Sequence, residues 1–256
     1  TFNPGSDFQD LGLGETRDVS FTYTVTDDSG ASDGTAVSAA QTVTITVTGT
    51  NDQPVATAAI TGAATEDAGA ISGQLSLASD VDQANTADTH TFQHTDMADG
   101  EGSVTVDAAT GAYSFDPGSD FQDLGLGETR DVSFTYTVTD DSGATDGSAV
   151  SAAQMVTITV TGTNDQPVAT AAITGAATED AGAISGQLSL ASDVDQANTA
   201  DTHTFQVSAM ASGEGTVTVN AATGEYTFDP GADFQDLAEG ETRDVTFTYT
   251  VTDDSG

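Results

Sequence analysis

The chain repeats itself with a period of 113 residues, and this self-similarity limits its possible folds more than any other feature. Residues 1–30, 114–143 and 227–256 are three copies of one stretch that align without a gap, and the eight residues 48–55 recur letter for letter at 161–168. Such a period indicates an array of units that each have the size of a single domain. A cut at the repeated Asn-Asp step predicts three parts of a longer array. These are the C-terminal part of a repeat (1–51), a complete repeat (52–164) and a repeat lacking its last strand (165–256).

Each unit is predicted to consist of short β-strands. Apolar residues alternate with serine and threonine over residues 132–138 and again over 156–160, which is typical of half-buried strands. Residues 116–128 are expected to form a crossover with room for one helical turn. About seven strands in a unit of this size predict an all-β fold of immunoglobulin-like or cadherin-like β-sandwiches joined end to end. The remaining strands are predicted at 54–61, 70–77, 89–95, 103–107 and 112–116, the last two forming a hairpin.

Composition narrows the possible partners. The chain has 41 Asp and Glu residues against three Arg, which gives a net charge of −38. A surface of this kind cannot replace the counterions of a nucleic acid, and it disfavours adsorption to an anionic membrane. No apolar run approaches the roughly 18 residues of a membrane span, so direct membrane insertion is not expected. Since self-repulsion works against a compact state, bound cations are favoured.

The carboxylates gather at particular distances from the Asn-Asp step instead of being scattered. Glu66 lies 14 residues after Asp52, the pair Asp80 and Asp82 begins 28 residues after it, and Asp140 ends the strand at 132–138. Oxygen ligands brought together from several loops suit Ca²⁺, which takes six to eight of them. The alternative is ordinary turn formation by Asx residues without metal. This alternative explains Asp67, Asp88 and Asp141 equally well.

Catalysis is not expected. His90 and His203 stand in Thr-His-Thr-Phe segments and are interpreted as packing or surface residues, and His94 is replaced by Val207 one period later. Paired carboxylates occur in glycosidases, but here no pair differs from its copy. Ser, His and Asp show no nucleophile-elbow spacing. The sequence therefore predicts a protein that is not an enzyme.

Several motifs carry a family resemblance. Val-x-Ile-x-Val followed by Asn-Asp-x-Pro resembles a cadherin repeat. Gly-Glu-Thr, Phe-Thr-Tyr-Thr-Val-Thr-Asp and Val-Thr-Gly-Thr-Asn-Asp are more closely similar to the VCBS and cadherin-like repeats of large bacterial surface adhesins. Many such adhesins leave the cell by type I secretion and carry RTX sequences. The resemblance implies an extracellular location at the bacterial surface.

The resemblance also implies a calcium site between successive units. Cadherins carry Asp two residues before the linker Asn, where this chain has Gly49 and Gly162, and Leu126 replaces the Asp of their Asp-Arg-Glu motif. We therefore expect one or two ions at each joint, not three. Carried over by position, the metal ligands are Glu15, Asn51, Asp52, Glu66, Asp80, Asp82, Glu128, Asp140, Asn164, Asp165, Asp193, Asp195 and Asp253.

These observations favour a calcium-stiffened extender region of a secreted bacterial adhesin, which projects binding domains for cell adhesion or biofilm formation. Its partners would be the neighbouring repeats of the same chain. One alternative is a self-assembling filament in which the incomplete end units exchange strands between copies. A second is a sugar- or protein-binding module. A salt-adapted acidic surface without a specific metal also remains open.

Overall fold

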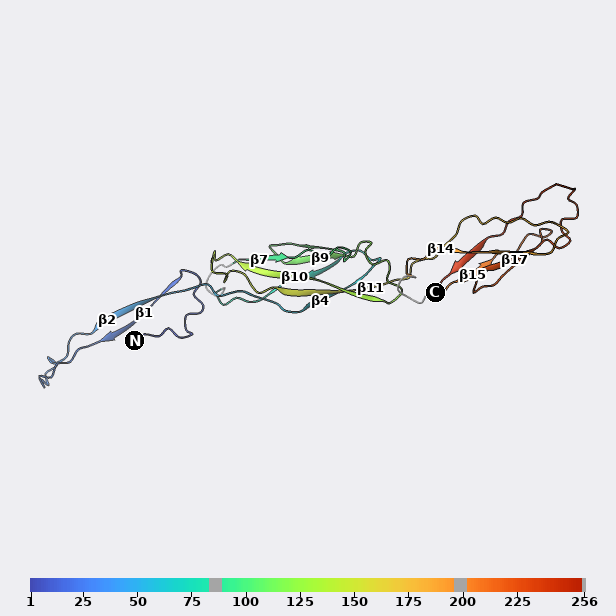
Figure 1. Ribbon diagram of the computed structural model, residues 1–256. Coiled ribbons are helices and arrows are strands. Elements are labelled where there is room, and N and C mark those ends of the chain that lie inside the picture. The colour runs from blue at the N-terminus through green and yellow to red at the C-terminus, as the bar shows by residue number, and fades with distance from the viewer. Residues whose placement is uncertain (83–88, 196–201, 255–256) are drawn as a thin grey trace.

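The computed structural model describes residues 1–82, 89–195 and 202–254, so the candidate Asp88 lies outside the described residues. Figure 1 shows three units following one another along an elongated molecule, with the first in blue, the second running from light blue through green to yellow, and the third in orange and red. Within the described ranges every regular element is a β-strand. The predicted all-β fold is confirmed, and no described helix has the length and apolarity needed to cross a bilayer.

The first unit is a single long hairpin. Strand β1 (Thr16–Tyr23) pairs antiparallel with β2 (Gln41–Thr48) over its full length. Its alternating apolar residues Val19, Phe21 and Tyr23 recur in the two later copies of this segment, but here Phe21 and Tyr23 are exposed.

The central unit, which contains β3 to β11, is a two-sheet sandwich. One sheet has the order β4-β11-β10-β7 and the other β5-β9-β8, while β3 and β6 form a short separate pair. Strand β10 is antiparallel to β7 and β11, whereas β4 runs parallel to β11. The strands are β3 (Val55–Ala56), β4 (Ile60–Thr65), β5 (Ile71–Gln74), β6 (Leu77–Ser79), β7 (His90–His94), β8 (Ser103–Val106), β9 (Ala112–Asp116), β10 (Thr129–Asp140) and β11 (Gln154–Thr161).

The core lies between these two sheets. Phe134 on β10 is 2% exposed and meets the ring of Tyr113 on β9 edge to face at 5.6 Å. Tyr136 is buried beside it, and its hydroxyl donates to the carbonyls of Thr57 at 2.7 Å and Ser76 at 3.0 Å. Because its hydroxyl finds two acceptors, Tyr136 can be fully buried, and it ties the segments around β3 and β6 to β10.

The predicted strands agree with the structure except at two places. The segment 54–61 is divided between β3 and β4, and Ala59 between them has a positive φ of 54°. The segment 70–77 is likewise divided between β5 and β6. The crossover at 116–128 consists of turns without a helix, and it delivers the buried side chains of Phe121 and Leu124 to the core. The predicted hairpin of β8 and β9 is confirmed, with Gly111 at φ 72° in its turn.

The third unit repeats much of this pattern. Its core gathers around Leu188, Phe205 and Phe228. Residues 173–178 have the same sequence as β4 but form no strand, because the described residues include no equivalent of β11, the strand with which β4 pairs. The strands are β12 (Val168–Ala169), β13 (Ile184–Gln187), β14 (Leu190–Ser192), β15 (Thr204–Val207), β16 (Thr216–Val219), β17 (Glu225–Asp229) and β18 (Tyr249–Thr252).

Candidate metal centre

The segment that joins the central and third units is held against the central unit by backbone hydrogen bonds. The amide of Gly162 donates to the carbonyl of Glu128 at 2.8 Å, and the amide of Gly127 donates to the carbonyl of Gly162 at 3.1 Å. A Cβ atom on residue 162 would lie 2.5 Å from the Leu124 carbonyl oxygen and closer still to that of Gly125. Glycine is therefore required here for a close approach of two backbones. This explains why the position carries no side chain that could bind metal.

At the first joint, the linker is bonded to the unit that follows it. The side-chain amide of Asn51 donates to Asp140 Oδ2 at 3.0 Å, and the backbone amide of Asp52 donates to Asp82 Oδ2 at 2.8 Å. Asp82 is 2% exposed and Asp140 is 6% exposed. Asp80 lies beside them, because its Oδ1 accepts from the amide of Asp82 at 3.3 Å. Five of the predicted ligands thus lie in one hydrogen-bonded group.

The second joint reproduces this arrangement. Asn164 donates to Asp253 Oδ2 at 3.0 Å, and the amide of Asp165 donates to Asp195 Oδ2 at 2.9 Å. Asp195 is as deeply buried as its counterpart in the preceding unit. Since the same bonds form one period apart, the arrangement follows from the repeated sequence.

Glu66 brings the preceding unit into the second joint. It follows β4 and is 1% exposed, and its Oε1 accepts from the amide of Thr163 at 2.5 Å and from the Thr163 hydroxyl at 3.2 Å. The same hydroxyl donates to Asp67 Oδ2 at 2.9 Å. The linker is therefore bonded to both units that it joins. Sequence reasoning missed Thr163, although its immediate neighbour Asn164 was a candidate.

The electrostatics of the joint disfavour ionised carboxylates. Burial raises the pKa of Glu66 and of Asp82 above their usual values. The pKa of Asp165 is also raised, first by burial and then by the negative charge of Asp195. The negative charge of Asp165, which lies across the joint, also contributes to the raised pKa of Glu66 in the preceding unit. Negative charges from two units thus face one another in a poorly solvated place.

Several of these oxygens are buried without a hydrogen-bond partner. Glu66 Oε2, Asp165 Oδ2 and Asp193 Oδ1 are in this state. Buried polar atoms are normally paired, so unpaired carboxylate oxygens in a joint indicate a place for a cation. The donor set of carboxylates and an amide oxygen is the kind that Ca²⁺ prefers. Among the described residues no three His, Cys, Asp or Glu side chains already surround one point, so the linker oxygens would have to complete a site.

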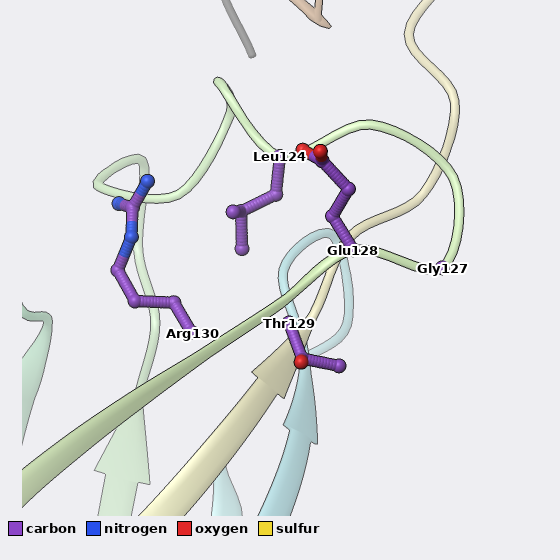
Figure 2. A pocket seen from close by; sticks show the side chains of 5 residues that line it. All are labelled: Leu124, Gly127, Glu128, Thr129 and Arg130. Atoms are coloured by element: carbon purple, nitrogen blue, oxygen red, sulfur yellow. The ribbon is translucent and has the colours of Figure 1, made fainter. Parts of the chain in front are cut away.

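Glu15 and Glu128 have a different environment from the other candidates. Figure 2 shows Glu128 immediately before β10, with its carboxylate directed toward the 124–127 loop. Its Oε2 accepts from the amide of Gly125 at 3.1 Å, and Glu15 Oε2 accepts from Gly12 in the same way. Both carboxylates therefore cap their own turns, and their hydrogen bonds do not reach the linker Asx residues. The shallow hollow beside this turn is lined by Leu124, Gly127, Glu128, Thr129 and Arg130.

The two histidines interpreted as packing or surface residues contact candidate ligands. His90 Nε2 lies 2.8 Å from Asp80 Oδ2, and His203 Nε2 lies 2.6 Å from Asp193 Oδ2. Both imidazoles are 8% exposed, and both aspartates are 1% exposed. The recurrence of Thr-His-Thr-Phe at the same distance from both Asp-x-Asp pairs was the available signal for this contact.

One family model matches most of the chain. The family described as bacterial cadherin-like domain matches residues 51–162 and 164–256. Among solved structures, repeats EC1–4 of Drosophila N-cadherin are 14% identical, with 98% of this chain and 57% of that chain covered and a TM-score of 0.38. Repeats EC22–24 of mouse cadherin-23 are 15% identical, with 83% and 63% covered and a TM-score of 0.49. The chain thus spans less than two thirds of either structure. The comparison with curated proteins found no match.

Proposed function

Because the chain belongs to the bacterial cadherin-like domain family, we propose that it is a calcium-stiffened extender region of a secreted bacterial surface adhesin. Its units are 1–51, 52–164 and 165–256, and the ions bind at the joints between them. The extender would project binding domains away from the cell surface, and the parent protein would reach that surface by type I secretion. The chain itself would have no catalytic role.

The observation that carries this proposal is the set of unpaired, buried carboxylate oxygens drawn from both sides of the second joint. Glu66 comes from the unit before the linker, Asp165 from the linker and Asp193 from the unit after it. A calcium ion would supply positive charge and oxygen coordination at this place. Without it, the repulsion between Glu66 and Asp165 favours separation of the two units. Binding would therefore favour one angle between them.

The calcium affinity expected for such a site suits an extracellular role. Extracellular calcium modules bind with a Kd of about 10⁻⁴–10⁻³ M, so millimolar calcium outside the cell occupies them and cytosolic calcium does not. At 1 mM calcium, which is about 1 to 10 times this Kd, one ion adds about 0.4–1.4 kcal/mol to the state that binds it. This is a measurable part of the roughly 5–15 kcal/mol that typically stabilises a domain. The chain would be pliable before secretion and stiff after it.

The test compares small-angle scattering and thermal melting of the full chain in EDTA, in CaCl₂ and in MgCl₂ at matched ionic strength. Calcium is expected to lengthen the particle and raise the melting temperature, with a smaller effect of magnesium. Asp165→Asn is expected to weaken both responses, whereas Asp96→Asn, at an exposed position, serves as the matched control. Identical curves in EDTA and CaCl₂ would leave an acidic spacer without a specific metal.

The two alternative functions, a strand-exchanged filament and a binding module, predict different measurements on the same samples. A strand-exchanged filament requires that the particle mass grow with protein concentration, and an extender predicts a constant mass. A sugar- or protein-binding module requires saturable binding of such a ligand by the units themselves.

A further inference from the structure

The buried histidines next to the candidate ligands have a role that packing alone does not explain. His90 begins β7, where it is the backbone partner of Asp140 on β10, and its side chain contacts Asp80. One residue thus connects two candidate ligands that come from different segments of the unit. His203 repeats the side-chain contact with Asp193 one period later.

The contact leaves the two oxygens of the aspartate in different states. In the third unit, Oδ2 of Asp193 is taken by the imidazole of His203, while its Oδ1 is buried and has no hydrogen-bond partner. With the imidazole and the carboxylate both almost fully buried, rotation of the carboxylate would break a bond that water cannot replace. The histidine therefore determines which oxygen remains for another partner.

We propose that His90 and His203 are positioning residues for calcium, and this inference rests on the proposed function. The Nε2–H group of each imidazole donates to Oδ2 of Asp80 or Asp193 and so holds Oδ1 for the ion. Neither histidine contacts the metal itself. Groups that orient metal-binding side chains in this way commonly change metal affinity by about 10- to 100-fold when they are removed.

The chain offers a matched control. His94 lies four residues after His90 on the same strand, and its ring meets that of Phe134 edge to face with 6.4 Å between the ring centroids. The next repeat carries Val207 at this position. His94→Val therefore removes an imidazole from β7 with a replacement that the fold already contains. It is expected to leave calcium affinity unchanged.

The experiment measures calcium binding by calorimetry to three full-length proteins: the unchanged chain and two double variants in which both histidines are replaced. The double variant His90→Leu/His203→Leu is expected to raise Kd by about 10- to 100-fold. The double variant His90→Gln/His203→Gln keeps an amide donor at a similar distance and is expected to restore most of the affinity. Wild-type affinity in the leucine variant, or equal loss in both variants, would overturn the positioning role. Absence of calcium binding by the unchanged chain would instead overturn the proposed function.

A second measurement needs no variant and decides the matter if the leucine variant does not fold. Long-range ¹H–¹⁵N correlation spectra of the calcium-loaded chain report which ring nitrogen carries the proton, with His94 as an internal reference. A proton on Nε2 of His90 and His203 is the expected result. A proton on Nδ1 alone would mean that the imidazole cannot donate to the aspartate, and the inference would fail.

Discussion

Replacing Gly162 by alanine tests the packing that holds the linker against the central unit. The new Cβ would lie 2.5 Å from the Leu124 carbonyl oxygen and 2.7 Å from the Leu124 Cβ. Ordinary contacts between such atoms are about 3.5–4.0 Å. The neighbouring atoms belong to backbone or to its first side-chain carbon, so no flexible group can move away.

We expect Gly162→Ala to destabilise the central unit by about 1–3 kcal/mol, as overpacking of a close contact does. For a domain of about 100 residues, each kcal/mol lowers the melting temperature by roughly 4 °C or more. The assay is thermal and urea unfolding of the full chain, followed by tyrosine fluorescence, in EDTA and in CaCl₂. The destabilisation should appear in both buffers, because the clash does not depend on metal.

Gly69→Ala is the matched control. A Cβ at residue 69 meets no heavy atom within 4 Å. This substitution should change stability by no more than about 1 kcal/mol, and in the stabilising direction if the unfolded chain loses freedom. If Gly162→Ala unfolded like Gly69→Ala, the packing of the 124–128 loop on the linker would be refuted.

Three further predictions concern the core and the joint. Tyr136→Phe removes the hydroxyl that donates to the Thr57 carbonyl and shares the Ser76 carbonyl with the Thr57 amide, and it should lower the free energy of unfolding by about 0.5–1.5 kcal/mol in urea titrations. Val138→Ala opens a cavity at a fully buried position and should lower it by about 2 kcal/mol in the same assay, while a change below 0.5 kcal/mol would contradict the described core. Without calcium, the raised pKa values of Glu66, Asp82 and Asp165 mean that the folded state binds more protons than the unfolded state. Melting temperature in EDTA should therefore fall as pH rises from about 4 toward 7, and calcium should reverse this trend because it binds the deprotonated carboxylates.

Much of the candidate site followed from the repeat and its spacing. The Asp-x-Asp pair, the strand-ending aspartate and the linker Asx residues are brought together as expected, since all lie at fixed offsets from one motif. The roles of Thr163 and His90 were not predicted. Thr163 acts through its backbone amide and hydroxyl, which threonine offers at any position, and His90 depends on a side chain held ten residues away by the fold.

The sequence by itself determined the strands and their local pairing. Strands β1 and β2 pair in the same register as β10 and β11, with Thr16 opposite Thr48 and Thr129 opposite Thr161. The alternation of apolar and polar residues within each hairpin, together with its short sequence separation, accounts for this agreement.

Only the tertiary structure decided which of these repeated strands lie in a core. Phe21 is 54% exposed, while Phe134, one period later in the same sequence context, is 2% exposed. The difference arises because β10 is covered by the opposite sheet of β5, β9 and β8, whose residues come from earlier in the unit. A strand's pattern predicts which face can be buried, but burial itself requires a partner surface that distant parts of the chain supply.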